Sequence, residues 1–175
     1  KVLYISTHQY PFYPGTGSFN EIGEGAGAGT TLNFPLRQGH GDREFFAIYG
    51  AIIRPIIEEF QPDLLLVSAG FDMLSVDPLG GMSLTMEGVT EVASELVAAC
   101  ASLGHKRVVF VLEGGYDLGG LSSAVARCAQ VLAREGNGDR SRIEISPSLP
   151  LGDLRAYAHW YRERLDDFGG IFEKI

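Results

Sequence analysis

Two short apolar runs constrain the fold of this 175-residue chain more than any other feature. They lie within residues 63–68 and 107–112, and their central residues are all apolar. Strands of this kind are typical of a parallel sheet that is covered on both faces. Residues 85–103 and 118–134, which follow the two runs, repeat apolar residues at helical spacing. This alternation predicts an α/β fold with a mainly parallel sheet sandwiched by helices.

The first sixty residues continue the same alternation. A segment rich in Gly, Pro and aromatic residues, 8–29, separates the first two expected strands. Long irregular segments are uncommon in compact domains unless they are functional or disordered, and the aromatic residues favour an ordered surface loop. The remaining elements expected here are strands over 2–6 and 30–36, and a helix over 42–60 that begins with Asp42 as its N-cap and bends at Pro55.

Charge and cysteine content narrow the classes of function. The net charge of −8 argues against direct binding of nucleic acid, because such binding depends on clustered Lys and Arg. No apolar run reaches the roughly 20 residues that cross a bilayer, so we expect no membrane segment. Cys100 and Cys128 both lie in helix-like apolar stretches, where thiols are usually inert core residues. We therefore expect a reducing, cytoplasmic location.

Polar residues follow the expected strands at their carboxyl ends, where open α/β sheets bind ligands. Asp72 follows the first apolar run and is either a metal ligand or the cap of a turn. Tyr116 follows two glycines and is either a hydrogen-bond donor to an oxyanion or an aromatic residue that fills space under a loop. Asp77 precedes a proline, which favours a turn residue over a second metal ligand.

Six segments together resemble the histone deacetylase superfamily, in the order and spacing of its class II and bacterial branch. The resemblance implies an arginase/deacetylase-like fold. It also implies that residues 1–135 form the C-terminal half of a deacetylase catalytic domain, and that residues 136–175 form a linker and the last helix of the same domain. The six segments are residues 5–10, 12–17, 21–23, 68–72, 77–81 and 113–116.

The resemblance also assigns roles to individual residues. It makes Asp72 one of three protein ligands of a zinc ion and Tyr116 the catalytic residue that stabilises the transition state. A tunnel for the substrate would be lined by five residues, and a monovalent cation such as K⁺ would lie at the end of the first strand. The tunnel residues are Phe12, Tyr13, Leu79, Gly114 and Gly115, and the cation-binding residues are Ser6 and Thr7.

The activity implied is zinc-dependent hydrolysis of an acyl-amide, with an acetylated lysine side chain as substrate. Hydrolysis of acetylpolyamines and non-catalytic binding of acyl-lysine are the alternatives. The Asp-x-His-His segment that carries the other two zinc ligands in the family is absent from these residues, and the chain starts at Lys1 directly before a strand. We therefore expect an incomplete fragment that is inactive alone.

Overall fold

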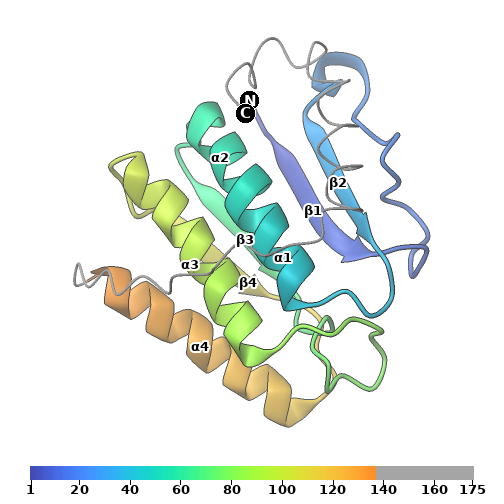
Figure 1. Ribbon diagram of the computed structural model, residues 1–175. Helices are drawn as coiled ribbons and strands as arrows, with labels where there is room; N and C mark the ends of the chain where they lie inside the picture. Colours follow the sequence, from blue (N-terminus) through green and yellow to red (C-terminus); the bar gives the residue numbers. More distant parts are fainter. Residues whose placement is uncertain (137–175) are drawn as a thin grey trace.

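The computed structural model describes residues 1–136, which form parallel strands with helices packed against them (Figure 1). The first two strands pair in parallel, with Tyr4 opposite Thr31. The last two also pair in parallel, and their final residues, Ala69 and Leu112, lie opposite each other. The expected α/β fold is confirmed. The strands are β1 (Tyr4–Gln9), β2 (Thr31–Leu36), β3 (Leu65–Ala69) and β4 (Val108–Leu112).

The long helices occupy the segments in which helical spacing was found, with ends that differ by one or two residues, while the short η1 lies in the segment expected to be a loop. No helix among the described residues is long and apolar enough to cross a membrane. The linker and last helix expected over 136–175 lie outside the described residues, except that Gly136 is the last residue of the helix α4. The helices are η1 (Gly25–Gly27), α1 (Asp42–Ile48), η2 (Tyr49–Ile53), α2 (Arg54–Phe60), α3 (Met86–Ser102) and α4 (Leu118–Gly136).

The segment expected to be one helix, 42–60, changes its hydrogen-bonding pattern in the middle. The turn η2 is π-helical, and Pro55 follows it in the first turn of α2. Proline has no N–H to donate to the preceding turn, so a local change of helical spacing next to it is expected. The hydroxyl of Tyr49, in η2, lies 3.0 Å from Thr7 Oγ1 and joins this turn to β1.

The sequence suggested Asp42 as the N-cap of α1, but Gly41 takes that position. The Asp42 carboxylate instead accepts hydrogen bonds from the backbone N (2.8 Å) and Oγ1 (2.6 Å) of Thr85. Thr85 is itself the N-cap of α3 and accepts a hydrogen bond from Gly88 N at 3.2 Å. The prediction was wrong because a partner distant in sequence competes for the carboxylate. Asp42 therefore fixes the start of α3 to the start of α1.

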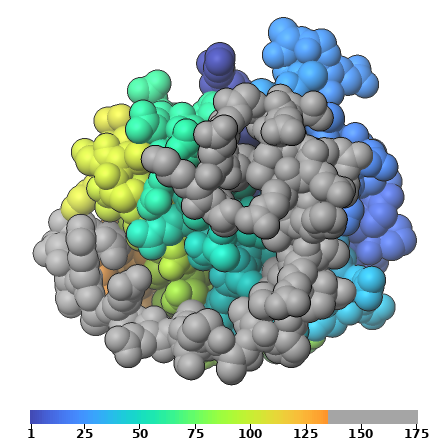
Figure 2. All heavy atoms as spheres, turned by 45° about the horizontal axis from the view of Figure 1, so that its top comes forward, coloured from blue at the N-terminus to red at the C-terminus, as the bar shows by residue number. Residues whose placement is uncertain are grey.

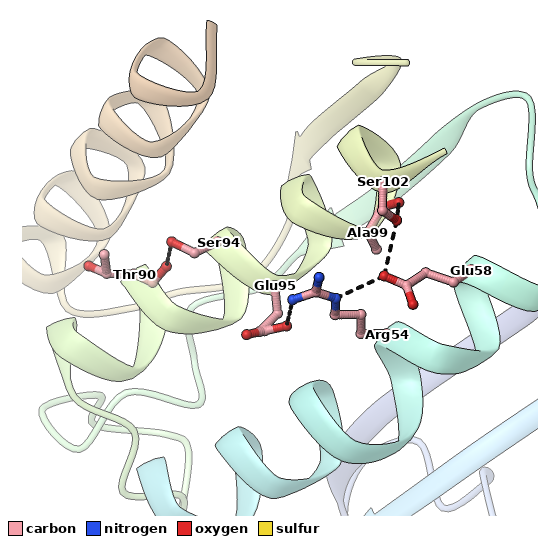
Figure 3. Close-up of polar contacts among 7 residues, drawn as sticks. All are labelled: Arg54, Glu58, Thr90, Ser94, Glu95, Ala99 and Ser102. Atoms are coloured by element: carbon pink, nitrogen blue, oxygen red, sulfur yellow. Dashed lines mark hydrogen bonds and ion pairs between the residues drawn. The ribbon is translucent and has the colours of Figure 1, made fainter. Parts of the chain in front are cut away.

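Arg54 joins α2 to α3 (Figure 3). Its guanidinium donates to Glu58 on its own helix at 2.9 Å and to Glu95 on α3 at 3.1 Å. The same oxygen of Glu58 accepts a hydrogen bond from Ser102 at 3.0 Å. Figure 2 shows α2 and the C-terminal end of α3 as neighbouring parts of one surface. Because these groups are partly exposed, the ion pairs contribute at most about 1 kcal/mol each.

The core lies between β2 and the helices, while one face of the β3–β4 pair is open. Leu65, Val67 and Phe110 point into the core, but the alternating residues of the same strands are exposed. Leu66 is 64% exposed, and Val109 and Val111 lie beside it on the same outer face. The strands are apolar on both faces, as predicted. Among residues 1–136 the helices cover only one of those faces.

Candidate functional site

The carboxyl ends of β3 and β4 bring two of the predicted loops together. We call residues 70–81 the Asp72 loop and residues 113–117 the Tyr116 loop. Phe71 N, in the first loop, donates a hydrogen bond to Gly114 O, in the second, at 2.8 Å. Parallel strands end at the same edge of a sheet, so Phe71 and Gly114 become neighbours although they are far apart in sequence.

The end of β1 reaches the same place. The Gln9 side chain, at the end of that strand, accepts a hydrogen bond from Gly81 N at 2.9 Å. A Cβ atom added at Gly81 would lie 2.8 Å from the Gln9 oxygen, so the absence of a side chain permits this contact. The Asp72 loop is therefore held at both ends, by Gly114 at its start and by Gln9 at its finish. No local sequence pattern indicates this use of Gln9.

Asp72 places its carboxylate against backbone that has no side chains. A Cβ atom added at Gly114 would lie 2.8 Å from Asp72 Oδ2, and one added at Gly70 would lie 3.3 Å from Oδ1. Partial burial, followed by the negative charge of Asp77, raises the pKa of Asp72 above its ordinary value. A half-buried carboxylate next to a second acid is stabilised by a cation, which fits the prediction of Asp72 as a metal ligand.

Asp77 is buried and joins the two loops through both of its oxygens. Oδ1 accepts from Leu79 N and Gly80 N at 2.9 Å each, and Oδ2 accepts from Tyr116 N at 2.7 Å. Burial opposes the charged form, but the N–H donors of Tyr116, Gly80, Leu79 and Asp117 outweigh it and lower the pKa of Asp77. The turn expected from the sequence is present. The contact with Tyr116 could not be foreseen from local sequence.

Tyr116 projects from a backbone that only glycine can form. Gly115 has φ of +137°, and a Cβ atom there would lie 2.8 Å from Leu121 Cδ1 and 3.3 Å from Phe71 Cβ. The Tyr116 side chain is 55% exposed. Among the described residues its hydroxyl has no hydrogen-bond partner, which leaves the hydroxyl free to donate to a ligand.

The three side chains predicted to line a substrate tunnel lie on the surface. Tyr13 is 91% exposed, and Phe12 and Leu79 are also exposed. Phe12 O accepts a hydrogen bond from Gly15 N at 2.6 Å, which forms a turn around Tyr13. Within residues 1–136 these side chains do not enclose a tunnel, and the substrate-binding roles of all five predicted residues stay predictions.

The predicted cation-binding residues, Ser6 and Thr7, lie in the middle of β1 and not at its end, and both already have side-chain partners. Ser6 Oγ lies 2.9 Å from His8 Nδ1, while the other ring nitrogen of His8 lies 2.9 Å from Gly17 O. Burial is the main reason that the pKa of His8 lies below its ordinary value. Thr7 contacts Tyr49, as described above. His8 therefore holds the long loop against β1 as a structural residue, and cation binding by Ser6 and Thr7 stays a prediction.

No group of three or more His, Cys, Asp or Glu side chains among residues 1–136 is placed to hold a metal ion. Asp72 is one suitable ligand without the others. Cys100 and Cys128 are buried, and burial raises the pKa of both thiols, which agrees with their interpretation as inert core residues. The chemistry of the carboxylate fits zinc, but the number of ligands in the described residues does not.

Sequence comparison shows what the chain is similar to. The family model described as "Histone deacetylase domain" matches residues 1–132. The chain is 44% identical over 125 residues to histone deacetylase 10, chloroplastic, of Oryza sativa subsp. japonica, a match that covers 71% of this chain and 28% of that protein. It is 43% identical over 120 residues to a probable deacetylase of Archaeoglobus fulgidus, covering 69% of this chain and 33% of that protein.

Structural comparison gives the same result. The crystal structure of the HDA15 HD domain matches with a TM-score of 0.77 at 30% identity, covering 97% of this chain and 45% of that one. The histone deacetylase Clr3 matches with a TM-score of 0.80 at 31% identity, covering 99% of this chain and 29% of that one. The fold is therefore the arginase/deacetylase fold. The chain belongs to the histone deacetylase family, and it spans about a third or less of the length of the two curated relatives named above.

The close fit of Asp72 against glycine predicts that a methyl group at Gly114 is costly. Gly114→Ala should lower the free energy of unfolding by about 1–3 kcal/mol, because the Cβ atom would force Asp72 or the Tyr116 loop to move. Gly119→Ala is the matched control, since its Cβ would lie 3.5 Å from the nearest atom and inside α4. Urea denaturation measures both. Equal stability of the two variants would contradict the predicted packing.

Proposed function

We propose that this chain supplies one half of the active site of a zinc-dependent deacetylase that hydrolyses the amide of an N-acetyl-lysine side chain. The observation that carries the proposal is the junction of the Asp72 loop and the Tyr116 loop, made by Phe71 N and Gly114 O. Membership of the histone deacetylase family supports the reaction class. Both residues that the family resemblance marks for chemistry thus lie on loops that are hydrogen-bonded to each other.

Each residue has a distinct task in this proposal. Asp72 supplies one carboxylate ligand to the metal. Tyr116 donates a hydrogen bond from its free hydroxyl to the oxyanion that forms when the amide carbonyl is attacked. The backbone of Gly114 and Gly115 lies beside the substrate, and the exposed Leu79 lies on the neighbouring loop. The acetyl group would then lie between the metal ligand and the tyrosine.

The zinc ion needs ligands that residues 1–136 do not supply. Catalytic zinc sites use three protein ligands and leave the fourth position open. Asp72 is one such ligand, and no group of three potential ligands is present in the described part of the chain. We propose that the other ligands come from the part of a deacetylase domain that these residues do not contain.

The open face of β3 and β4 fits this requirement. Leu66, Val109 and Val111 present an apolar surface that a parallel sheet normally covers. The HDA15 HD domain is more than twice as long as the part that this chain matches. We propose that the remainder of such a domain packs on this face and brings its ligands to Asp72.

Substitution at the two key residues should separate metal binding from catalysis in a complete deacetylase domain. Asp72→Ala is expected to lose zinc and turnover together. Tyr116→Phe is expected to keep zinc and lose turnover by about 10²- to 10³-fold, as for other oxyanion donors. Metal analysis and turnover of an acetyl-lysine peptide measure the two effects. Tyr4→Phe is the matched control, because Tyr4 is as exposed as Tyr116 but lies on β1.

Three outcomes would contradict this proposal. If Tyr116→Phe and Asp72→Ala both kept full turnover, neither residue would have its proposed role. If the unsubstituted domain bound the acetyl-lysine peptide without hydrolysing it, non-catalytic binding of acyl-lysine would be favoured. If acetylspermidine were hydrolysed and the peptide were not, the substrate would be an acetylpolyamine.

A charged side chain on the open face of β3 and β4 should lower stability only when the rest of the domain is present. Leu66→Lys is expected to leave the unfolding free energy of the 175-residue chain nearly unchanged, because that side chain is already mostly exposed. In a complete domain the same change should lower stability by several kcal/mol through a buried unpaired charge, and zinc and turnover should be lost. Denaturation of both forms measures this. Equal effects in the two forms would mean that nothing covers the face.

A further inference from the structure

The position of Tyr116 depends on contacts of its backbone, because its side chain makes few contacts of its own. The ring is about half exposed, and among the described residues the hydroxyl makes no hydrogen bond. The preceding residue, Gly115, has a positive φ, and a glycine can adopt many backbone conformations because it has no side chain. The direction in which the side chain leaves the backbone is therefore set by contacts of the backbone of the Tyr116 loop.

The strongest of those contacts is with Asp77. The distance of 2.7 Å from Tyr116 N to Asp77 Oδ2 is short for a hydrogen bond to nitrogen, as expected when a carboxylate accepts. The other oxygen holds Leu79 N and Gly80 N at 2.9 Å each. Asp77 as a whole residue is only 9% exposed, so water competes weakly for these donors. One side chain thus connects the backbone of Tyr116 to the backbone of Leu79.

We propose that Asp77 is the positioning residue for Tyr116: its carboxylate fixes the Tyr116 hydroxyl relative to Leu79 and Asp72. This inference rests on the proposed function, because it gives Asp77 a part in the same reaction. Asp77 is not a metal ligand in this proposal, since both of its oxygens are occupied by N–H donors. Displacement of a reacting group by about 1 Å can cost about a hundredfold in rate, so the position of the tyrosine matters.

Only a carboxylate satisfies all of these donors. An amide at this position has one oxygen, and its NH₂ group would face an N–H donor on one of the two loops. The single oxygen of an amide satisfies more donors when it faces Leu79 N and Gly80 N. Asp77→Asn therefore keeps the size of the side chain and removes its connection to Tyr116 N. Asp42→Asn is the matched control, because the two oxygens of Asp42 also accept hydrogen bonds, from the backbone N–H and the hydroxyl of Thr85, but lie outside the site.

The test is a double-mutant cycle in a complete, zinc-loaded deacetylase domain. Asp77→Asn is expected to lower kcat by about tenfold or more, with KM changed less than about twofold and zinc content unchanged. In a Tyr116→Phe background, the same substitution should lower kcat by less than about twofold, because its effect passes through the tyrosine hydroxyl. Asp42→Asn should change kcat by less than about twofold in both backgrounds.

Amide hydrogen exchange tests the contact without using turnover. The Tyr116 amide should exchange about tenfold faster or more in Asp77→Asn, while amides of the β3–β4 pair stay protected. Unchanged exchange at Tyr116, or an equal loss of kcat in both backgrounds, would overturn the inference about Asp77. Absence of turnover in the unsubstituted domain would instead overturn the proposed function, and the exchange result would still decide whether Asp77 holds the loop.

Discussion

Parallel pairing of β3 with β4 is the constraint on which the rest of the site depends. Because Ala69 and Leu112 lie opposite each other, the loops that follow them start side by side. The hydrogen bond from Phe71 N to Gly114 O then continues the contact beyond the strands. Glycine at 114 lets the Asp72 carboxylate lie against the backbone of the other loop. A side chain there would separate the two residues on which the proposed chemistry depends.

Much of this arrangement could be predicted from the sequence, because it follows from periodicity and chain order. The apolar runs around residues 63–68 and 107–112 indicated parallel strands buried on both faces. The structure confirms the parallel strands, but one face of the pair is exposed within residues 1–136. The rule that ligands bind at the carboxyl ends of such strands pointed to the loops of Asp72 and Tyr116. The resemblance to deacetylases then distinguished these two residues from ordinary turn residues, and the family is confirmed by comparison.

The contacts that organise the site could not be predicted, because each joins residues far apart in sequence. Asp77 was interpreted as a turn residue from the proline that follows it, which accounts for its Oδ1 contacts but not for the bond to Tyr116 N. Asp42 looked like the cap of its own helix and instead holds Thr85. Local patterns report the partners within a few residues, and a carboxylate with two oxygens has capacity for others.

In the proposed site, Asp72 is a metal ligand and Asp77 supports the Tyr116 loop. The most direct test is the absorption spectrum of a complete deacetylase domain loaded with cobalt(II) in place of zinc. Thiolates bind such metals directly, so Asp72→Cys should introduce a thiolate-to-cobalt charge-transfer band that is absent from Asp77→Cys. A band of equal strength in both variants, or a band in Asp77→Cys alone, would contradict the account.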